Sequence, residues 1–210
     1  QPMSDNTLQF QWMMTLQGGL DALFRDDPNV FVAGDLLWYP VEGDNTVRAA
    51  PDVLVVFGRP KGYRGSYKQW DEDGIAPQVV FEVLSPNNRV REMVAKFQFY
   101  DRFGVEEYYL FDPDRIDLSG WIRRGDDLVE IDQADGWTSP RLGVRFDLSS
   151  GDLRVFAPDG RPFATYVELV EQRECERQQA QQEHQRAQQE HQRAERLAAQ
   201  LRALGVEPNG

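Results

Sequence analysis

Cysteine is almost absent from this sequence of 210 residues, and histidine is scarce. The single cysteine, Cys175, excludes an internal disulfide and a cysteine-based zinc site, and it favours a cytoplasmic location. No apolar run is long enough to span a membrane and no signal-peptide pattern is found, so we expect no association with a membrane. Both histidines, His184 and His191, lie near the C-terminus, about 10 Å apart on a helix, which is too far to chelate one metal ion.

Positive charge is also in deficit. The chain carries 23 Lys and Arg against 35 Asp and Glu, a formal net charge of −12. Proteins that hold DNA through many phosphate contacts usually present a basic face, so this balance argues against bulk electrostatic binding of DNA. It leaves room for a local basic groove and for weak or specific binding.

The apolar pattern of residues 1–165 predicts an α/β (or α+β) domain built on a mixed β-sheet with flanking helices. The expected elements are, in order, a helix over 5–25, short strands in VFVAGDLLWYP and PDVLVVF, a long loop over 58–77, a strand over 79–84, a helix over 87–103, a strand over 106–112 and hairpins after it. The strand, helix and strand between 79 and 112 form a parallel crossover unit.

Residues 166–210 have a different composition. The heptad AQQEHQR occurs twice, at 180–186 and 187–193. Seven-residue spacing defines a seam, which contains Ala180, Glu183, Ala187, Glu190, Ala194, Leu197, Leu201 and Leu204. Because two glutamates interrupt this seam, we expect a long, largely solvated helix that forms only a weak coiled coil. It would pair with a second copy in a homodimer or bind another protein.

The stretch QVVFEVLSPNN places Glu82 inside an apolar strand. Burial of an ionised carboxylate there lowers the stability of the fold by roughly several kcal/mol unless an arginine, a lysine or a metal ion pairs with it. Asp52 begins another apolar strand, and if the two strands are neighbours, both carboxylates converge on one hard cation such as Mg²⁺. Aspartate is common at the start of a strand because it favours the preceding turn, so this pair alone is a weak signal of a metal site. Ser85-Pro86 is expected to begin the following helix, with Ser85 as its cap.

Lys96 is the sharper observation. It falls on the apolar stripe of the expected helix, with Met93, Tyr100 and Phe103. The chain has only three lysines against twenty arginines, yet it places a lysine on this stripe. A buried ammonium needs an anion, and it can orient a water or stabilise charge that develops on a phosphate. The alternative is that Lys96 only neutralises Glu82 or extends past the aromatic side chains to solvent.

The segment GRPKGYRGSYK gathers four cations, Arg59, Lys61, Arg64 and Lys68. They are candidate contacts for a DNA backbone. The competing interpretation is a solvated charged loop balanced by Asp71, Glu72 and Asp73.

Taken together, PDVLVV, VVFEVLSPNN, the helix with Lys96-Phe97-xx-Tyr100, and GVEEYYLFDP resemble the Uma-type restriction endonucleases of cyanobacteria, within the PD-(D/E)XK nuclease superfamily. The resemblance covers most of residues 5–165 and includes GDLLWYP and SGW. It implies a restriction-endonuclease-like fold and an endodeoxyribonuclease that uses Mg²⁺, or Mn²⁺, to hydrolyse DNA.

The resemblance also assigns roles residue by residue. Asp52 and Glu82 would bind the metal, the Val83 carbonyl would complete its shell, and Asp35 is a candidate fourth acid. The superfamily's usual lysine stands two residues after the second acid, where this sequence has Leu84; Lys96 on the following helix would replace it.

Two other functions compete with this one. The first is a catalytically inactive nuclease-fold protein that uses its C-terminal helix to bind a partner. The second is a two-carboxylate hydrolase of the glycosidase kind, with Glu82 as the acid. A lysine facing Glu82 argues against the latter, because it would lower the pKa of that carboxyl group.

Overall fold

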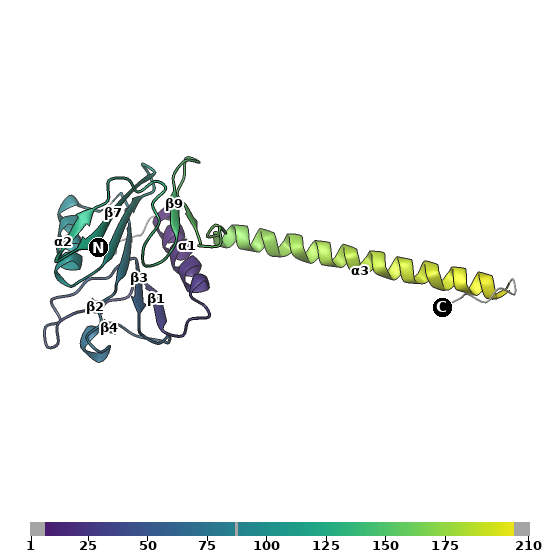
Figure 1. Ribbon diagram of the computed structural model, residues 1–210, viewed down its shortest axis with the longest axis horizontal. Helices are drawn as coiled ribbons and strands as arrows, with labels where there is room; N and C mark the ends of the chain where they lie inside the picture. The colour runs from purple at the N-terminus through teal and green to yellow at the C-terminus, as the bar shows by residue number, and fades with distance from the viewer. Residues whose placement is uncertain (1–6, 87, 204–210) are drawn as a thin grey trace. The chain divides into compact units, whose positions relative to one another are not determined.

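The computed structural model describes residues 7–86 and 88–203. The chain divides into two compact units, Gln1–Thr165 and Tyr166–Gly210. The first unit has a six-stranded mixed sheet with helices, which confirms the predicted fold class (Figure 1). The second contains one long helix, α3 (Tyr166–Ala203).

The strands of the main sheet follow the order β1-β3-β5-β6-β7-β8. The elements of the first unit are α1 (Thr7–Leu23), β1 (Val30–Gly34), β2 (Trp38–Tyr39), β3 (Val53–Phe57), β4 (Tyr67–Lys68), a 3₁₀ turn (Gln69–Asp71), β5 (Val79–Val83), α2 (Val90–Arg102), β6 (Glu107–Asp112), β7 (Asp117–Arg124), β8 (Asp127–Glu130), β9 (Arg145–Asp147) and β10 (Arg154–Phe156). Strands β5 and β6 are parallel and α2 connects them, as the predicted crossover requires. The other neighbouring strands of this sheet are antiparallel.

Alternate side chains of the sheet enter two separate cores, because successive residues of a strand point to opposite faces. On one face, Val53 and Phe81 pack with Leu16 of α1 and with β9 and β10. On the other face, Leu54 and Val80 pack with residues of α2, β2 and β4. Glu82 follows Val80 by two positions, so the sheet points its side chain toward α2.

The segment 58–77 is more ordered than the long loop expected from its glycines and charges. It contains β4, which pairs in parallel with β2, and Trp38 lies opposite Tyr67 in their register. Both rings are fully buried, and Tyr67 Oη donates a hydrogen bond of 2.7 Å to the Ile75 carbonyl. These aromatic side chains fold the segment against the α2 face of the sheet.

The start of α2 differs from the prediction. The helix begins at Val90, and Arg89 is its N-cap residue, whose backbone N–H donates to the Glu92 carboxylate at 3.3 Å. The predicted cap at Ser85 is wrong, because the Ser85 N–H donates instead to Asn88 Oδ1 at 2.6 Å in a local turn. Position 87, like positions 5 and 6 of the expected first helix, lies outside the described residues.

Helix α3 exposes Ala180, Ala187 and Ala194 of the seam that the heptads define. Leu197, on the same seam, is 51% exposed, whereas Leu204 lies outside the described residues. Across the part of the chain that the structure describes, no helix has the length and apolar character needed to cross a membrane.

Candidate active site

Two acids that lie far apart in the sequence meet where strand β3 begins and the neighbouring strand β5 ends. Strands β3 and β5 are antiparallel neighbours with Val53 opposite Phe81, which brings Asp52 beside Glu82 and Val83. Asp52 Oδ2 accepts a hydrogen bond of 2.7 Å from the Val83 N–H. Asp52 is 9% exposed and Glu82 is 2% exposed, so both carboxylates are largely withdrawn from water.

Helix α2 covers the same face and places two side chains on Glu82. Lys96 Nζ lies 2.6 Å from Glu82 Oε2 and 3.4 Å from the Ala50 carbonyl oxygen. One helical turn later, Tyr100 Oη donates a hydrogen bond to Glu82 Oε1. Each oxygen of the buried carboxylate therefore has a donor from α2. The side chain of Lys96 is 29% exposed, so it is less buried than its place on the apolar stripe indicates.

The electrostatics of this group are strongly perturbed. Burial raises the pKa of Glu82 to about 7, with Lys96 opposing the shift and the charge of Asp52 adding to it. Burial likewise raises the pKa of Asp52, against the Val83 N–H and Lys96, which lower it. Burial disfavours the Lys96 ammonium, but the Glu82 carboxylate outweighs this and leaves the pKa of Lys96 above its usual value. Lys96 is thus charged at neutral pH and is a hydrogen-bond donor.

Tyr100 remains a phenol in this setting. Its burial and the neighbouring Glu82 carboxylate both raise its pKa well above the usual value. A phenol that keeps its proton donates to the carboxylate and fixes its orientation.

Gln9 on α1 completes the surroundings of Asp52, and the sequence analysis did not identify it. The core-facing stripe of α1 contains Gln9, Met13, Leu16 and Leu20. Gln9 is 6% exposed, and its Nε2 donates to Asp52 Oδ2 at 3.4 Å. Its Oε1 is buried and has no partner among the described residues. An unsatisfied buried acceptor costs about 1–3 kcal/mol. A polar residue at this position of an apolar stripe was the available signal.

Asp35 lies close to the two acids but is not buried with them. It follows β1, and its N–H donates to the Asp52 carbonyl oxygen at 3.2 Å. Its side chain is exposed, and its backbone is left-handed with φ of 47°. Its charge adds to the causes that raise the pKa values of Asp52 and Lys96. Its role as a metal ligand stays a prediction.

The arrangement of these side chains fits a hard cation that is held by a small number of protein ligands. The described residues contain no group of three Asp, Glu, His or Cys side chains that could hold a metal ion, so two carboxylates would be the core of such a site. Mg²⁺ is commonly held by one or two carboxylates, with water and phosphate oxygens completing its shell. Within the described residues, Asp52 Oδ1 accepts no hydrogen bond, whereas Oδ2 accepts from Val83 and Gln9. The Lys96 ammonium already lies between the oxygens of Glu82 and Ala50, which is a position that suits positive charge.

The cations of the 58–77 segment are engaged in ion pairs with its own acids. Arg59 Nε lies 2.8 Å and Arg64 Nε 2.5 Å from the carboxylate of Glu72. Arg59 also pairs with Asp73, and Lys61 lies 3.5 Å from Asp21. Both arginine side chains are half-buried and paired with acids of the same segment, which favours the balanced-loop interpretation with Glu72 and Asp73 as the acids. DNA contact by Arg59, Lys61, Arg64 and Lys68 stays a prediction.

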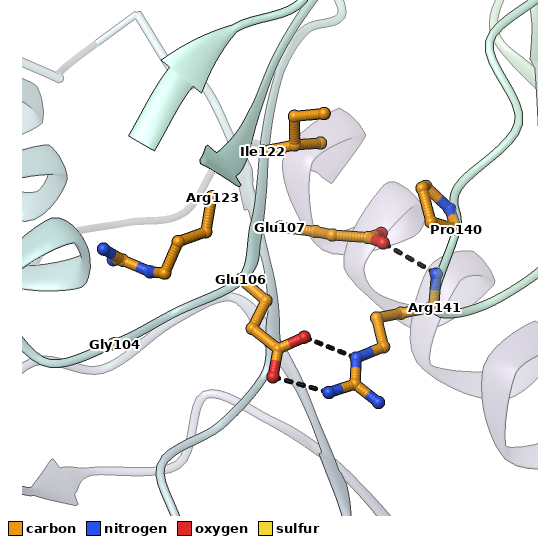
Figure 2. A pocket seen from close by; sticks show the side chains of 7 residues that line it. All are labelled: Gly104, Glu106, Glu107, Ile122, Arg123, Pro140 and Arg141. Carbon is orange, nitrogen blue, oxygen red and sulfur yellow. Dashed lines mark hydrogen bonds and ion pairs between the residues drawn. The ribbon is translucent and has the colours of Figure 1, made fainter. Parts of the chain in front are cut away.

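A further buried carboxylate, Glu107, lines a cavity of about 440 Å³ at the start of β6 (Figure 2). The cavity lining consists of Gly104, Glu106, Glu107, Ile122, Arg123, Pro140 and Arg141. Glu107 accepts hydrogen bonds from Tyr109 Oη at 2.9 Å, from Ser139 and from the Arg141 N–H at 2.7 Å. Arg141 pairs in turn with Glu106 through two hydrogen bonds. Because each charge has a partner, this cluster is structural.

Arg123, at the same cavity, fixes the C-terminal end of α2. Its guanidinium donates to the carbonyl oxygens of Asp101 at 2.6 Å and of Val105 at 2.8 Å. Cations at this end of a helix satisfy its last carbonyl groups and interact favourably with its dipole. The contact attaches α2, and with it Lys96 and Tyr100, to β7.

Comparisons with known proteins identify the family of this chain. The model of the Uma2 family, described as "Putative restriction endonuclease", matches residues 14–154, more than half of the chain. A comparison with curated proteins finds no match. A solved structure described as a putative nuclease belonging to DUF820 from Anabaena variabilis is 16% identical, with 66% of this chain and 74% of that chain covered and a TM-score of 0.49. The family match includes Asp52, Glu82, Lys96 and Tyr100 and begins after Gln9. It confirms the family resemblance of the sequence motifs: the chain belongs to the Uma2 family of putative restriction endonucleases.

Proposed function

We propose that this protein is a Mg²⁺-dependent endonuclease that hydrolyses phosphodiester bonds of DNA. The observation that carries the proposal is the meeting of Asp52, Glu82 and the Lys96 ammonium at one edge of the sheet. Membership of a family of restriction endonucleases supports the reaction class. The pair of carboxylates supports a hard divalent cation, for which Mg²⁺ is the first candidate and Mn²⁺ the second.

Asp52 and Glu82 would hold the cation, with the Val83 carbonyl as a further ligand. A bound Mg²⁺ polarises a phosphate oxygen and makes a nearby water more acidic. In the hydrolysis, the oxygen of a water forms a bond to phosphorus and the water gives up a proton to the solvent. The bond from phosphorus to the leaving sugar oxygen breaks, and that oxygen takes a proton from the solvent.

Lys96 acts in this scheme as a donor and not as a general base. Its pKa is raised, so it carries its proton at neutral pH. Its ammonium is on a flexible stem, and the side chain is 29% exposed, so the ammonium can leave Glu82 Oε2 and bind an oxygen of the phosphate instead. A positive charge at that point stabilises the negative charge that develops on the phosphate. Tyr100 keeps Glu82 oriented through the other carboxylate oxygen.

Nicking of supercoiled plasmid DNA in the presence of Mg²⁺ or Mn²⁺ tests the proposal. We expect Asp52→Asn and Lys96→Met to reduce the rate by at least about 100-fold, the effect of removing a group that stabilises transition-state charge. Glu130→Gln, at the exposed end of β8, is the matched control and should nick at the wild-type rate. Equal rates for the wild type, Asp52→Asn and Lys96→Met would overturn the proposal.

The second candidate is a catalytically inactive nuclease-fold protein that binds a partner through α3. What favours it is that both oxygens of Glu82 already have donors within the protein. Calorimetric titration with Mg²⁺ separates the two functions, because an inactive fold has no requirement for the ion. Binding that Glu82→Gln abolishes would count against this candidate.

The proposal includes a homodimer, in which two sites can address the two DNA strands. The identical heptads of α3 offer a seam for a second copy, and the same helix could hold another protein. Contacts to the DNA backbone are assigned to the 58–77 segment, where Lys68 is exposed and has no ion pair among the described residues.

A further inference from the structure

The amide of Gln9 is a buried polar group on the otherwise largely apolar face of α1. It occupies the first turns of the α1 stripe that continues with Met13 and Leu16 into the core. Its residue is 6% exposed, and its Oε1 has no partner among the described residues. Buried acceptors of this kind are usually satisfied by the protein, by a bound water or by an ion.

The orientation of this amide follows from its neighbour. Asp52 Oδ2 can only accept, so the NH₂ group of Gln9 must be the part that faces it, at 3.4 Å. The carbonyl oxygen is then directed away from Oδ2 but stays beside Asp52, and the charge of Asp35 also acts on that carboxylate. A buried acceptor beside these negative charges suits a water that donates a proton to it. A water bound to a divalent cation directs its oxygen at the cation and its protons away from it, so it can donate in this way. Mg²⁺ keeps several of its waters when it binds to proteins, and those waters need acceptors.

We propose that Gln9 is a positioning residue of the cation site. Its amide NH₂ holds Asp52 Oδ2, which leaves Oδ1 for the cation, and its Oε1 accepts a hydrogen bond from a water in the cation's shell. This inference rests on the proposed function, because it requires that Asp52 and Glu82 hold Mg²⁺. It adds a residue that lies outside the matched part of the family, which begins at residue 14.

Mg²⁺ affinity, measured by titration calorimetry on the full chain, tests the inference. Gln9→Met keeps the shape of the side chain but removes both the donor and the acceptor. We expect it to weaken Mg²⁺ binding by about 10- to 100-fold, as is typical when a partner of a metal ligand is lost. Plasmid nicking should show a lower kcat and an unchanged KM for DNA. Gln11→Met, the same change at an exposed position of α1, is the control and should bind Mg²⁺ as the wild type does.

Gln9→Glu provides a second test, in which the stabilising effect of Mg²⁺ is expected to increase instead of decrease. It keeps an acceptor but adds a charge that faces Asp52, so the midpoint of thermal unfolding without metal should fall. Addition of Mg²⁺ should then raise the midpoint by more than it does in the wild type, because the new carboxylate attracts the cation. Gln11→Glu should show the wild-type shift.

The results separate this inference from the proposed function. If the wild type binds Mg²⁺ and Gln9→Met binds it equally well, the inference fails and the nuclease proposal stands. It also fails if Gln9→Glu gains no more from Mg²⁺ than the wild type. If the wild type itself binds no Mg²⁺, the proposed function fails and this inference fails with it.

Discussion

Replacement of Lys96 by methionine tests how much the contact between Lys96 and Glu82 contributes to the stability of the fold. The change removes the ammonium that lies 2.6 Å from Glu82 Oε2 and keeps an apolar stem of similar length. Glu82 is 2% exposed, so its carboxylate cannot turn to water. Removal of one partner of a fully buried ion pair costs about 3–5 kcal/mol.

Two features of the structure reduce this cost. The hydrogen bond from Tyr100 remains, and Glu82 can take up a proton because burial raises its pKa to about 7. We therefore expect Lys96→Met to lower the free energy of unfolding by about 2–3 kcal/mol at pH 8, the contribution of a hydrogen bond between charged groups. For a unit of this size the midpoint of thermal unfolding should fall by about 4–12 °C. At pH 5 the loss should be smaller, because Glu82 is then protonated.

Urea unfolding at pH 8 of the wild type, Glu82→Gln, Lys96→Met and the double variant measures the coupling directly. Lys61→Met is the control, because its ammonium lies 3.5 Å from the exposed Asp21, and it should cost less than about 1 kcal/mol. A coupling energy below about 0.5 kcal/mol between Glu82 and Lys96 would refute the reasoning.

Three further predictions concern other parts of the chain. Hydrogen bonds from Arg64 and Arg59 lower the pKa of Glu72. The ionised carboxylate therefore stabilises the folded state above the unfolded pKa of Glu72, and this stabilisation is lost as the pH falls through the folded pKa. Glu72→Gln should be less stable than the wild type at pH 7, and the difference between their urea midpoints should disappear below about pH 4. Ile116 is β-branched and left-handed, with φ of 55°; Ile116→Asn should raise the free energy of unfolding by about 1 kcal/mol, and a loss of stability would contradict this. The proposed homodimer predicts a dimer mass for the wild type in light scattering and a monomer mass for Ala187→Arg, which places a charge on the α3 seam. A dimer mass for both proteins would exclude this seam as the contact.

Local patterns in the sequence predict the elements of this fold well and their long-range partners less well. The parallel crossover follows from two apolar strands on either side of a helical stripe, and the structure has it. The meeting of Glu82 with Lys96 also follows, because a carboxylate and an ammonium on two facing apolar surfaces can each be stabilised only by an opposite charge. Whether these residues act in catalysis stays a prediction.

Other features depend on contacts that no local pattern contains. The pairing of β2 with β4 depends on Trp38 and Tyr67, whose burial is decided by the register of two short segments distant in sequence. The start of α2 depends on a turn in which Ser85 donates to a side chain three positions later, and this turn competes with helix capping. Gln9 was missed because its role depends on Asp52, a residue more than forty positions later in the sequence that no local pattern of α1 indicates.

The contacts of Arg123 with the Asp101 carbonyl group at the end of α2, and with the Val105 carbonyl group just beyond it, make the position of Lys96 depend on the β7–β8 hairpin as well as on the core. The aromatic side chains of α2, such as the buried Tyr100, would keep the helix folded against the sheet if these contacts were lost. The Lys96 ammonium would then be held less firmly beside Glu82, while circular dichroism would still report an intact protein. Any activity centred on that carboxylate should therefore be sensitive to changes in the hairpin, far from the acids themselves.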